Sequence, residues 1–239
     1  MDLNNVASTL SGMGELEEAL ATFNEAAEGS LAVLGAEHPH TLRAMQNQVA
    51  TLTRLQRPAE ALPLQQQVLE VRERTLGAEH PDTLKSRDTL AQVLRDLGRV
   101  EEARVISERV LETRIRTLGL AHPDTEAATT VLASIEVDGG RPERARSLLE
   151  ELLQRQRVAH GDAHHDSVRT AARLYPLLLQ AGQAQAAADL RAELLEPLLA
   201  RDPEELDGRM RQARDAVQEA LEKDRRRGGD APANGGAGG

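Results

Sequence analysis

Cysteine is absent from this chain of 239 residues, and aromatic residues are nearly absent, with one Phe, one Tyr and no Trp. Without cysteine there are no disulfides, no thiolate metal sites and no cysteine nucleophiles. Without aromatic rings there is almost nothing on which the bases of a nucleic acid could stack. These two absences remove several classes of site and weaken the case for nucleic acid as a partner.

A basic excess is also missing, because 29 Lys and Arg face 39 Asp and Glu, for a formal charge of −10. Nucleic acid and anionic membrane surfaces both attract proteins with an excess of basic residues. No apolar run approaches the roughly 20 residues of a membrane span, and the N-terminus lacks the pattern of a signal peptide. We therefore expect no nucleic acid partner, no membrane partner and a cytoplasmic protein. Only two lysines occur, Lys85 and Lys223, which together with the alanine content indicates a GC-rich bacterial gene.

Catalytic signatures are missing as well. The sequence contains no Gly-rich phosphate loop, no G-x-S-x-G elbow and no H-E-x-x-H motif. The paired glutamates, such as Glu101 and Glu102, fall in segments that read as solvated helix faces. We predict that the chain is not an enzyme and needs no cofactor.

What the chain does have is a repeat. The stretch L-G-A-E-H-P-D-T-L at residues 76–84 has relatives that begin at residues 34, 118 and 160, each 42 residues from the next. A fixed period of this length is the signature of a repeat architecture. The histidine-proline motif therefore marks the boundary between successive structural units.

Each repeat predicts two antiparallel helices. The loop prolines Pro39, Pro81 and Pro123 suit the first turn of a helix, where a missing N–H costs nothing. Neighbouring Asp or Thr should supply the capping oxygen, and a glycine such as Gly98 should end the helix. A second helix follows, with apolar residues at steps of three and four. Small residues recur where helices must touch, at positions Ala19, Ala61, Ala91, Ala103, Ala133, Ala145 and Ala187.

The period, the loop motif and the glycine and alanine positions resemble the tetratricopeptide repeat, in the 42-residue version of the kinesin-light-chain type. The resemblance covers about residues 2–200. It implies an all-α fold, a right-handed superhelical solenoid of antiparallel helix pairs. No long heptad region precedes the repeats, so the chain differs from a kinesin light chain. Bacterial signalling proteins also carry such repeats.

The repeat divides the chain into a partial repeat at residues 1–33 and full repeats at 34–75, 76–117, 118–159 and 160–201. We expect a capping helix at 202–227 and a disordered Gly-rich tail at 228–239. The short first repeat suggests that the chain is part of a longer protein or a trimmed repeat array. In the last repeat His165 replaces the loop proline, Tyr175 takes a small-residue position, and Pro176 should kink the helix.

The histidines allow two interpretations. His38, His80, His122 and His164 hold the same position in successive repeats, which places them at least about 10 Å apart. Ligands to one zinc ion lie about 2 Å from it, so these four cannot share an ion, and we expect them to anchor the loops. The cluster of His160, His164, His165 and Asp166 could gather locally, but no cysteine or outer-shell pattern supports it. We predict no metal site.

The resemblance also implies a binding surface, because the first helices of such repeats line the inside of the superhelix. Carried over by register, the candidate residues are Asn4, Asn5, Arg43, Gln46, Asn47, Lys85, Gln92, Arg95, Arg169 and Arg173. Among all the inward-facing positions that the resemblance implies, Asp88 is the only acidic residue, so the surface is basic although the chain is acidic. An amide such as that of Asn5 or Asn47 can pair with a peptide backbone whatever its side chains.

We therefore predict a non-catalytic scaffold that binds an extended, acidic segment of another protein. Two alternatives stay open. The repeats could be a regulatory or structural segment of a larger bacterial signalling protein, packing on its own chain or self-associating. The first helices could also be ordinary solvated faces. The sequence leaves the oligomeric state and the partner undetermined.

Overall fold

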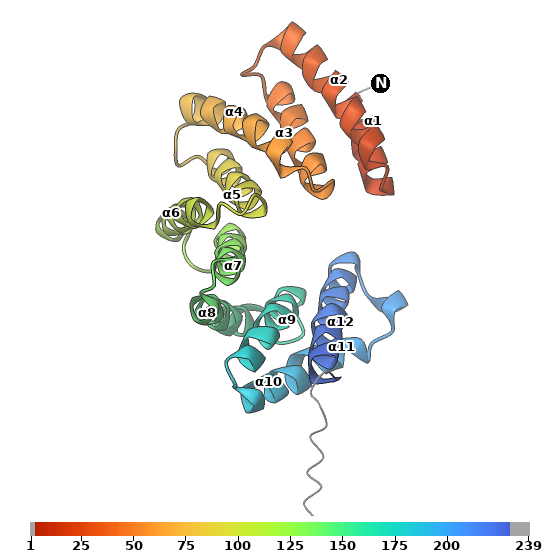
Figure 1. The fold of residues 1–239 in the computed structure, drawn as a ribbon, viewed down its shortest axis with the longest axis vertical. Coiled ribbons are helices and arrows are strands. Elements are labelled where there is room, and N and C mark those ends of the chain that lie inside the picture. Colours follow the sequence, from red (N-terminus) through yellow and green to blue (C-terminus); the bar gives the residue numbers. More distant parts are fainter. Residues whose placement is uncertain (1–2, 230–239) are drawn as a thin grey trace, which may run out of the picture. The chain divides into compact units, whose positions relative to one another are not determined.

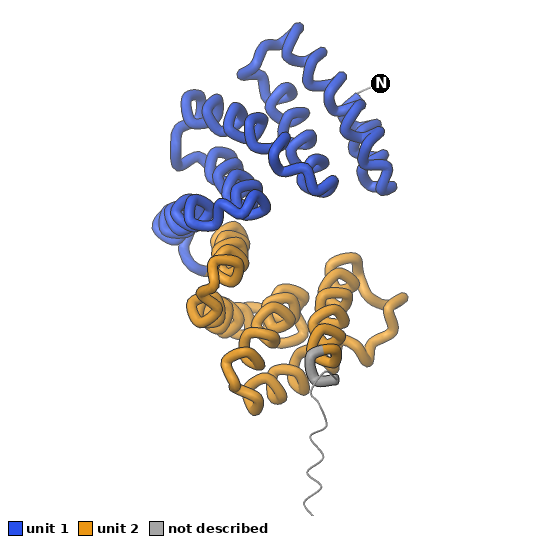
Figure 2. Tube along the Cα trace, in the orientation of Figure 1, with its two compact units in different colours: residues 1–120 blue, residues 121–239 orange. Residues whose placement is uncertain are grey.

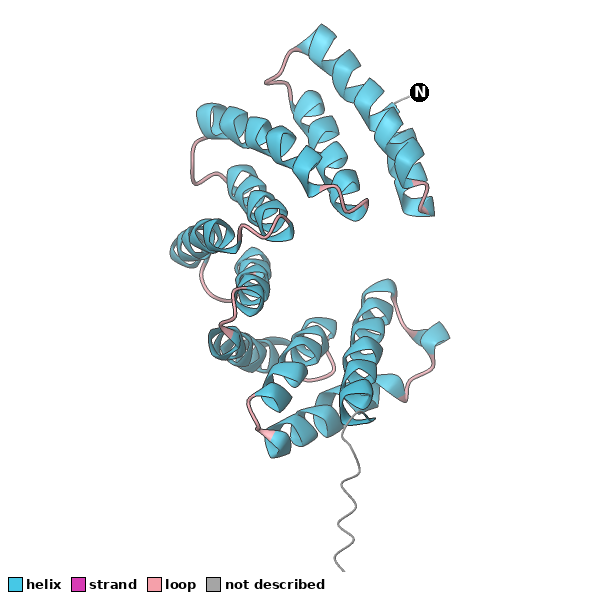
Figure 3. Cartoon of the chain, in the orientation of Figure 1, coloured by secondary structure: helices cyan, strands magenta, loops and turns pink. Residues whose placement is uncertain are grey.

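The computed structural model describes residues 3–229, and within this range all regular secondary structure is helical (Figure 3). The predicted disordered tail at 228–239 lies outside the described residues from residue 230 onward, and its first two residues belong instead to the last helix. Two compact units divide the chain, residues 1–120 and residues 121–239 (Figure 2). No helix among the described residues is both long and apolar enough to cross a membrane.

The first unit consists of helices that pair in chain order, each packing against the next (Figure 1). They are α1 (Leu3–Met13), α2 (Leu16–Leu34), α3 (Pro39–Arg54), α4 (Pro58–Leu76), α5 (Pro81–Asp96) and α6 (Val100–Leu118). The 42-residue period is kept to the residue, because α5 begins and ends 42 residues after α3, and α6 does the same after α4. The first helix of the chain is shorter than its counterparts, as the partial first repeat predicts.

The second unit starts with the same plan and then departs from it. It contains α7 (Pro123–Asp138), α8 (Pro142–His160), α9 (His165–Gln180), α10 (Ala184–Leu190), a π turn (Arg191–Leu195), α11 (Glu196–Leu199), a 3-10 turn (Pro203–Glu205) and α12 (Gly208–Gly229). Helices α7, α8 and α9 follow one another as packed neighbours, and α9 also packs against α10 and α12.

Helix boundaries follow the residues that predicted them. Pro39, Pro81 and Pro123 are the first residues of α3, α5 and α7. Past the ends of α5 and α7, Gly98 and Gly140 have φ of 76° and 71°. A side chain with a Cβ pays a steric cost in this left-handed region, which is why glycine recurs there.

Small side chains lie where helices approach closely. The alanines of the second helices, Ala19, Ala61, Ala103, Ala145 and Ala187, are all fully buried, and so is Ala91 on α5. Because a methyl group is small, the axes of two helices that meet at these alanines can lie at the short end of the usual 8–10 Å range. The predicted role of these alanines in helix packing is confirmed.

The last repeat differs from the plan more than the sequence predicted. Helix α9 continues through Pro176 to Gln180. The second helix is instead interrupted by the π turn, which ends at Leu195, directly before α11, whose second residue is Pro197. Proline has no N–H to donate to the preceding turn, and π turns accommodate such local irregularity. The following helix α12 begins at Gly208 rather than near residue 202, and the carboxylate of Asp207 accepts the N–H of Met210, 2.8 Å away.

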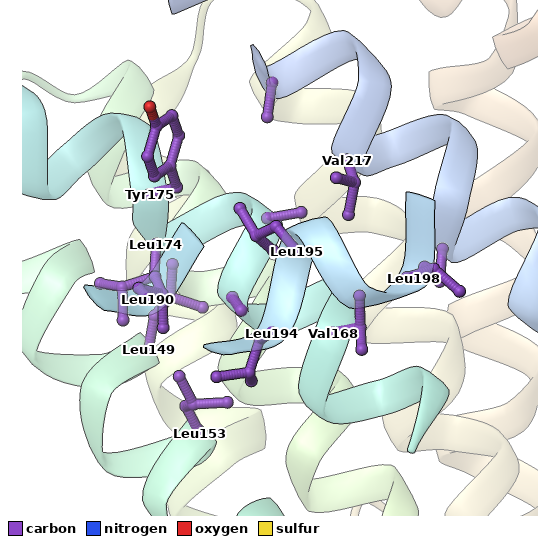
Figure 4. Close-up of a cluster of buried hydrophobic side chains, with 14 of the residues drawn as sticks. Leu149, Leu153, Val168, Leu174, Tyr175, Leu190, Leu194, Leu195, Leu198 and Val217 are labelled. Atoms are coloured by element: carbon purple, nitrogen blue, oxygen red, sulfur yellow. The ribbon is translucent and has the colours of Figure 1, made fainter. Parts of the chain in front are cut away.

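The core of the second unit is a cluster of mostly aliphatic side chains from α7 to α12 (Figure 4). Leu149 and Leu153 of α8, Leu174 of α9 and Val217 of α12 all belong to this cluster. Tyr175 is buried in it, at a position where Ala91 and Ala133 stand in earlier repeats. This larger side chain lies where α12 packs onto α9. Among the described residues, the earlier repeats have no such contact with α12.

Candidate functional site

The predicted binding residues fall on the first helices of both units. Those of the first unit lie on α1, α3 and α5, and those of the second unit lie on α9. Asn5, Arg43, Lys85 and Arg173 are exposed; Gln46, Asn47, Gln92, Arg95 and Arg169 are half-buried; Asn4 is buried. We call the side chains of Asn5, Arg43, Lys85, Gln92 and Arg95 the first-helix face of unit 1, and Arg169 and Arg173 the arginine pair of unit 2.

The asparagines of the first unit bind each other. The Asn47 side-chain amide donates to the side-chain oxygen of Asn4 at 3.0 Å, and Asn4 is only 7% exposed. This bond ties α1 to α3. Asn4 therefore serves helix packing rather than ligand contact, whereas Asn5 beside it is exposed.

The side chain of Gln46 accepts a hydrogen bond from a buried arginine. Arg72 on α4 is 9% exposed and donates to the Gln46 side-chain oxygen on α3, at 2.8 Å. The same guanidinium donates to the hydroxyl of Ser86 at 2.8 Å and to the carbonyl of Asp82 at 3.0 Å. Burial lowers the pKa of Arg72, and the charge of Asp82 opposes this. Gln46 thus belongs to an internal polar contact that joins three helices.

The counterparts of Arg72 in the next two repeats make similar contacts. Arg114, 5% exposed, forms an ion pair with Asp88 of α5 at 2.5 Å. Gln156, 3% exposed, donates to the carboxylate of Glu126 on α7 at 2.7 Å. Asp88 is therefore neutralised inside the helix pair. These three buried polar residues were not among the predicted ones, although their 42-residue spacing is visible in the sequence.

The predicted basic residues differ in whether they form ion pairs with carboxylates. Arg95 forms an ion pair with the neighbouring Asp96 at 2.9 Å. Lys85, Arg169 and Arg173 have no carboxylate within ion-pair distance in the part of the chain that the structure describes. Arg173 is exposed as a whole residue, but desolvation of its guanidinium group by the surrounding protein, followed by the nearby charge of Arg169, lowers its pKa. The arginine pair of unit 2 is thus a local concentration of positive charge without an internal counter-ion among described residues.

The repeated histidines cap the first helices. In α3, α5 and α7 the Nδ1 atom of the histidine accepts the backbone N–H two residues later, at 3.2, 3.1 and 3.1 Å. These residues are His38, His80 and His122, and the prediction that they anchor the loops is confirmed. The capping atom itself is a correction, because we expected an Asp or Thr oxygen. Thr41 instead donates its hydroxyl to the Gly35 carbonyl at 2.8 Å, on the far side of the loop.

The fourth loop gathers more titratable groups than the others. The His164 and His165 rings lie 4.1 Å apart between centroids, and the His160 ring lies 4.6 Å from that of His164. His164 Nδ1 accepts the N–H of Asp166 at 3.4 Å. Burial, then the charges of His165 and His160, lowers the pKa of His164, while Asp166 opposes the shift. The cluster that the sequence analysis set aside is therefore a real assembly of side chains.

Models of the family described as tetratricopeptide repeat match residues 3–40, 45–116 and 87–154, together more than half of the chain. The chain belongs to the tetratricopeptide repeat family. No curated protein matches it.

Solved structures agree with this tetratricopeptide repeat fold. One is a kinesin-light-chain-type protein of Podosopora anserina with nearly identical TPR-like repeats, at 23% identity and a TM-score of 0.71, covering 94% of this chain and 95% of that chain. A second is BtubC (BKLC) from P. vanneervenii, at 15% identity and a TM-score of 0.66, covering 88% of this chain and 90% of that chain. These similarities confirm the all-α solenoid of kinesin-light-chain-type repeats.

A third similar structure is a Rap protein complexed with Competence and Sporulation Factor, at 11% identity and a TM-score of 0.65. It covers 95% of this chain and 64% of that chain. Tetratricopeptide repeats are typical of non-catalytic protein-interaction scaffolds, and the fold supports that general role here.

Proposed function

We propose that this tetratricopeptide repeat protein is a non-catalytic scaffold whose first helices bind an extended acidic peptide of another protein. The observation that carries the proposal is that basic residues on the second helices form ion pairs, whereas several on the first helices do not. On the second helices and their loops, arginines pair with glutamates, as in Arg99–Glu102 at 2.7 Å and Arg104–Glu101 at 2.9 Å. Lys85, Arg169 and Arg173 on the first helices have no such partner among the described residues.

The arginine pair of unit 2 suits a carboxylate ligand. Arg169 and Arg173 are four residues apart on α9, so their side chains share one helix face. Two like charges at this spacing destabilise each other, and after desolvation the charge of Arg169 is the second cause of the lowered pKa of Arg173. An acidic side chain bound between them would relieve this repulsion and accept bonds from the planar guanidinium groups.

The first-helix face of unit 1 adds a different kind of contact. Lys85 is exposed and offers a positive charge, and Asn5 is exposed and offers both a donor and an acceptor. An extended peptide has unpaired backbone amides, so an asparagine can bind it without reading its sequence. Charge would then select an acidic peptide, and Asn5 would hold its backbone.

Removal of the first-helix cations tests this proposal. The probe is a fluorescent, unstructured peptide of alternating Glu and Ser, and binding is followed by anisotropy at low salt. Each exposed ion pair contributes up to about 1 kcal/mol, so the triple variant K85Q/R169Q/R173Q should bind about tenfold more weakly. Its circular dichroism should match that of the unchanged protein.

A matched variant separates local contact from overall charge. R99Q/R104Q/R116Q removes the same number of positive charges from residues that pair with glutamates on the second helices and loops. We expect it to bind the peptide nearly as well as the unchanged protein does. Equal weakening by both triple variants would mean that net charge alone attracts the peptide, and the proposed surface would be wrong.

One observation favours self-association as a second candidate. Leu3, Val33 and Leu34 are exposed apolar residues, with Val33 81% exposed, and they line a hollow of about 330 Å³ between α1, α2 and α3. Burial of such a patch against a second copy would be favourable. Light scattering of the chain should then show a dimer that V33D converts to monomer. A monomer at all concentrations would contradict this candidate.

A further inference from the structure

We propose that His164, His165 and Asp166 form a binding site for one divalent transition metal ion of the zinc class, where the sequence analysis expected none. His164 precedes α9, and His165 and Asp166 are the first two residues of that helix. One ligand atom from each residue lies within 4.8 Å of the ligand atoms of the other two. Two imidazoles and a carboxylate are ligands that suit zinc and its neighbours in the first transition row.

The separations between the ligand atoms are somewhat longer than those of an occupied metal site. His165 Nε2 lies 3.4 Å from one carboxylate oxygen of Asp166, and His164 Nδ1 lies 3.7 Å from the other. With one atom from each residue, the three ligand atoms lie within 4.8 Å of one another, whereas ligands about 2 Å from zinc in a tetrahedral arrangement are about 3.3 Å apart. Side-chain rotation would therefore have to draw these atoms closer around one ion.

Comparison among the repeats shows what is special about this loop. The other three loops have a proline where this loop has His165, and their histidine caps have N···N distances of 3.1–3.2 Å. In the fourth loop the corresponding distance, from the Asp166 nitrogen to His164 Nδ1, is 3.4 Å. Replacement of proline by histidine thus supplies a second imidazole in the one loop where the capping atom is most weakly held. A metal ion at His164 Nδ1 would replace that long hydrogen bond.

The backbone around the three ligands is held firmly. Ser167 donates its hydroxyl to the Gly161 carbonyl at 2.9 Å, closing the loop. Val168, one residue further, is buried in the core cluster of the unit (Figure 4). A site at the start of a packed helix needs little rearrangement to bind an ion, so little binding free energy is lost in ordering the loop.

Space for the remaining coordination positions lies next to the histidines. His164 and His165 line a cavity of about 840 Å³, whose other walls include Glu205, Asp207 and Arg209. Three protein ligands with an open position are typical of metal sites that also bind water or a small anion. The site would therefore hold an ion with a free position facing this cavity.

Zinc titration by calorimetry tests the proposal on the full chain after treatment with EDTA. We expect one zinc ion per chain at neutral pH. H165P should weaken binding at least about tenfold, since loss even of residues behind the ligands costs 10–100-fold. This variant gives the loop the His-Pro-Asp sequence of its neighbours, so the helix start should be kept. D166N removes the carboxylate and should weaken binding similarly.

Two controls make the result specific. H122N changes the equivalent histidine of a loop that has proline beside it, and zinc affinity should stay unchanged because asparagine also caps helices. Magnesium, which prefers oxygen ligands, should produce no binding heat. The proposal is overturned if zinc does not bind, if H165P and D166N both bind it as tightly as the unchanged chain, or if H122N weakens binding as much as they do. Thermal melting by circular dichroism confirms that each variant is folded.

Discussion

Tyr175 shows how one residue adapts a repeat to its position in the chain. Its counterparts in the two preceding repeats are alanines, whereas Tyr175 is buried and donates its hydroxyl to the carboxylate of Asp224 on α12, at 2.7 Å. The hydroxyl of Tyr175 thus links α9, the first helix of the last repeat, to α12. A buried hydrogen-bonded tyrosine at this point stabilises the end of the repeat array.

This contact has a measurable consequence at high pH. Burial, then the hydrogen bond to Asp224, raises the pKa of Tyr175 above its usual value of 10.0. The stabilisation is thus complete below about pH 10, the pKa of an unfolded tyrosine, and is lost as the pH rises through the folded pKa. Tyr175 is the only tyrosine and there is no tryptophan, so absorbance at 295 nm follows this group alone. We expect Tyr175 to titrate at a higher pH in the folded protein than in the urea-unfolded chain. In the D224N variant its titration should shift toward that of the unfolded chain. Identical folded and unfolded curves would contradict the contact.

The buried ion pair of Arg114 and Asp88 is a second feature at the scale of residues. Removal of one partner leaves a buried charge without compensation, which costs about 3–5 kcal/mol. R114M should therefore lower the urea midpoint strongly. The double variant R114M/D88N should recover most of the loss, because neither charge then remains buried. If the double variant is no more stable than R114M, the pair is not coupled as the structure indicates.

At the scale of elements, the repeat sets the positions of the helices. The loop motif fixes where α3, α5 and α7 begin, since proline and the capping histidine both favour a helix start. Glycine fixes where chains can turn after α5 and α7. These local preferences act within a few residues, which is why they could be predicted from the sequence.

Long side chains that reach between helices could not be predicted in the same way. Arg72 meets Gln46, 26 residues earlier, and Asn47 meets Asn4, 43 residues earlier. The resemblance to the repeat family implied that Gln46 and Asn4 lie on a binding face, but a register carried over from a family cannot say which polar side chain another helix engages. The interruption before Pro197 was missed for a related reason. Whether a proline bends, ends or widens a helix depends on how neighbouring helices pack around it.

Close packing of helix pairs gives a test at this scale. Ala103 on α6 is fully buried against a neighbouring helix. A103L adds three carbons where no space exists, which should cost about 1–3 kcal/mol of unfolding free energy, measured in urea. The matched change A59L, at an exposed position of α4, should be nearly neutral. If A103L were also neutral, the assignment of Ala103 to the helix contact would be wrong.

At the scale of the whole molecule, charge is distributed unevenly. The chain carries a formal charge of −10, yet its first helices present Lys85, Arg169 and Arg173 without ion pairs among the described residues. Helices of a repeat array bury their apolar faces against neighbours, so stability comes from the interfaces between successive repeats. Solvent-facing residues are then free to vary without loss of the fold. This division explains how one family of repeats serves different partners.

The most direct test of the account compares two peptides on the unchanged protein. One alternates Glu and Ser, and the other has Gln in place of every Glu, so that length and flexibility are equal. We predict that only the acidic peptide binds, and that its affinity falls as salt is raised from low to physiological concentration, because exposed charges are screened within about 8 Å at that ionic strength. Equal binding of both peptides, or binding that salt does not change, would contradict the central claim that the first helices select an acidic segment.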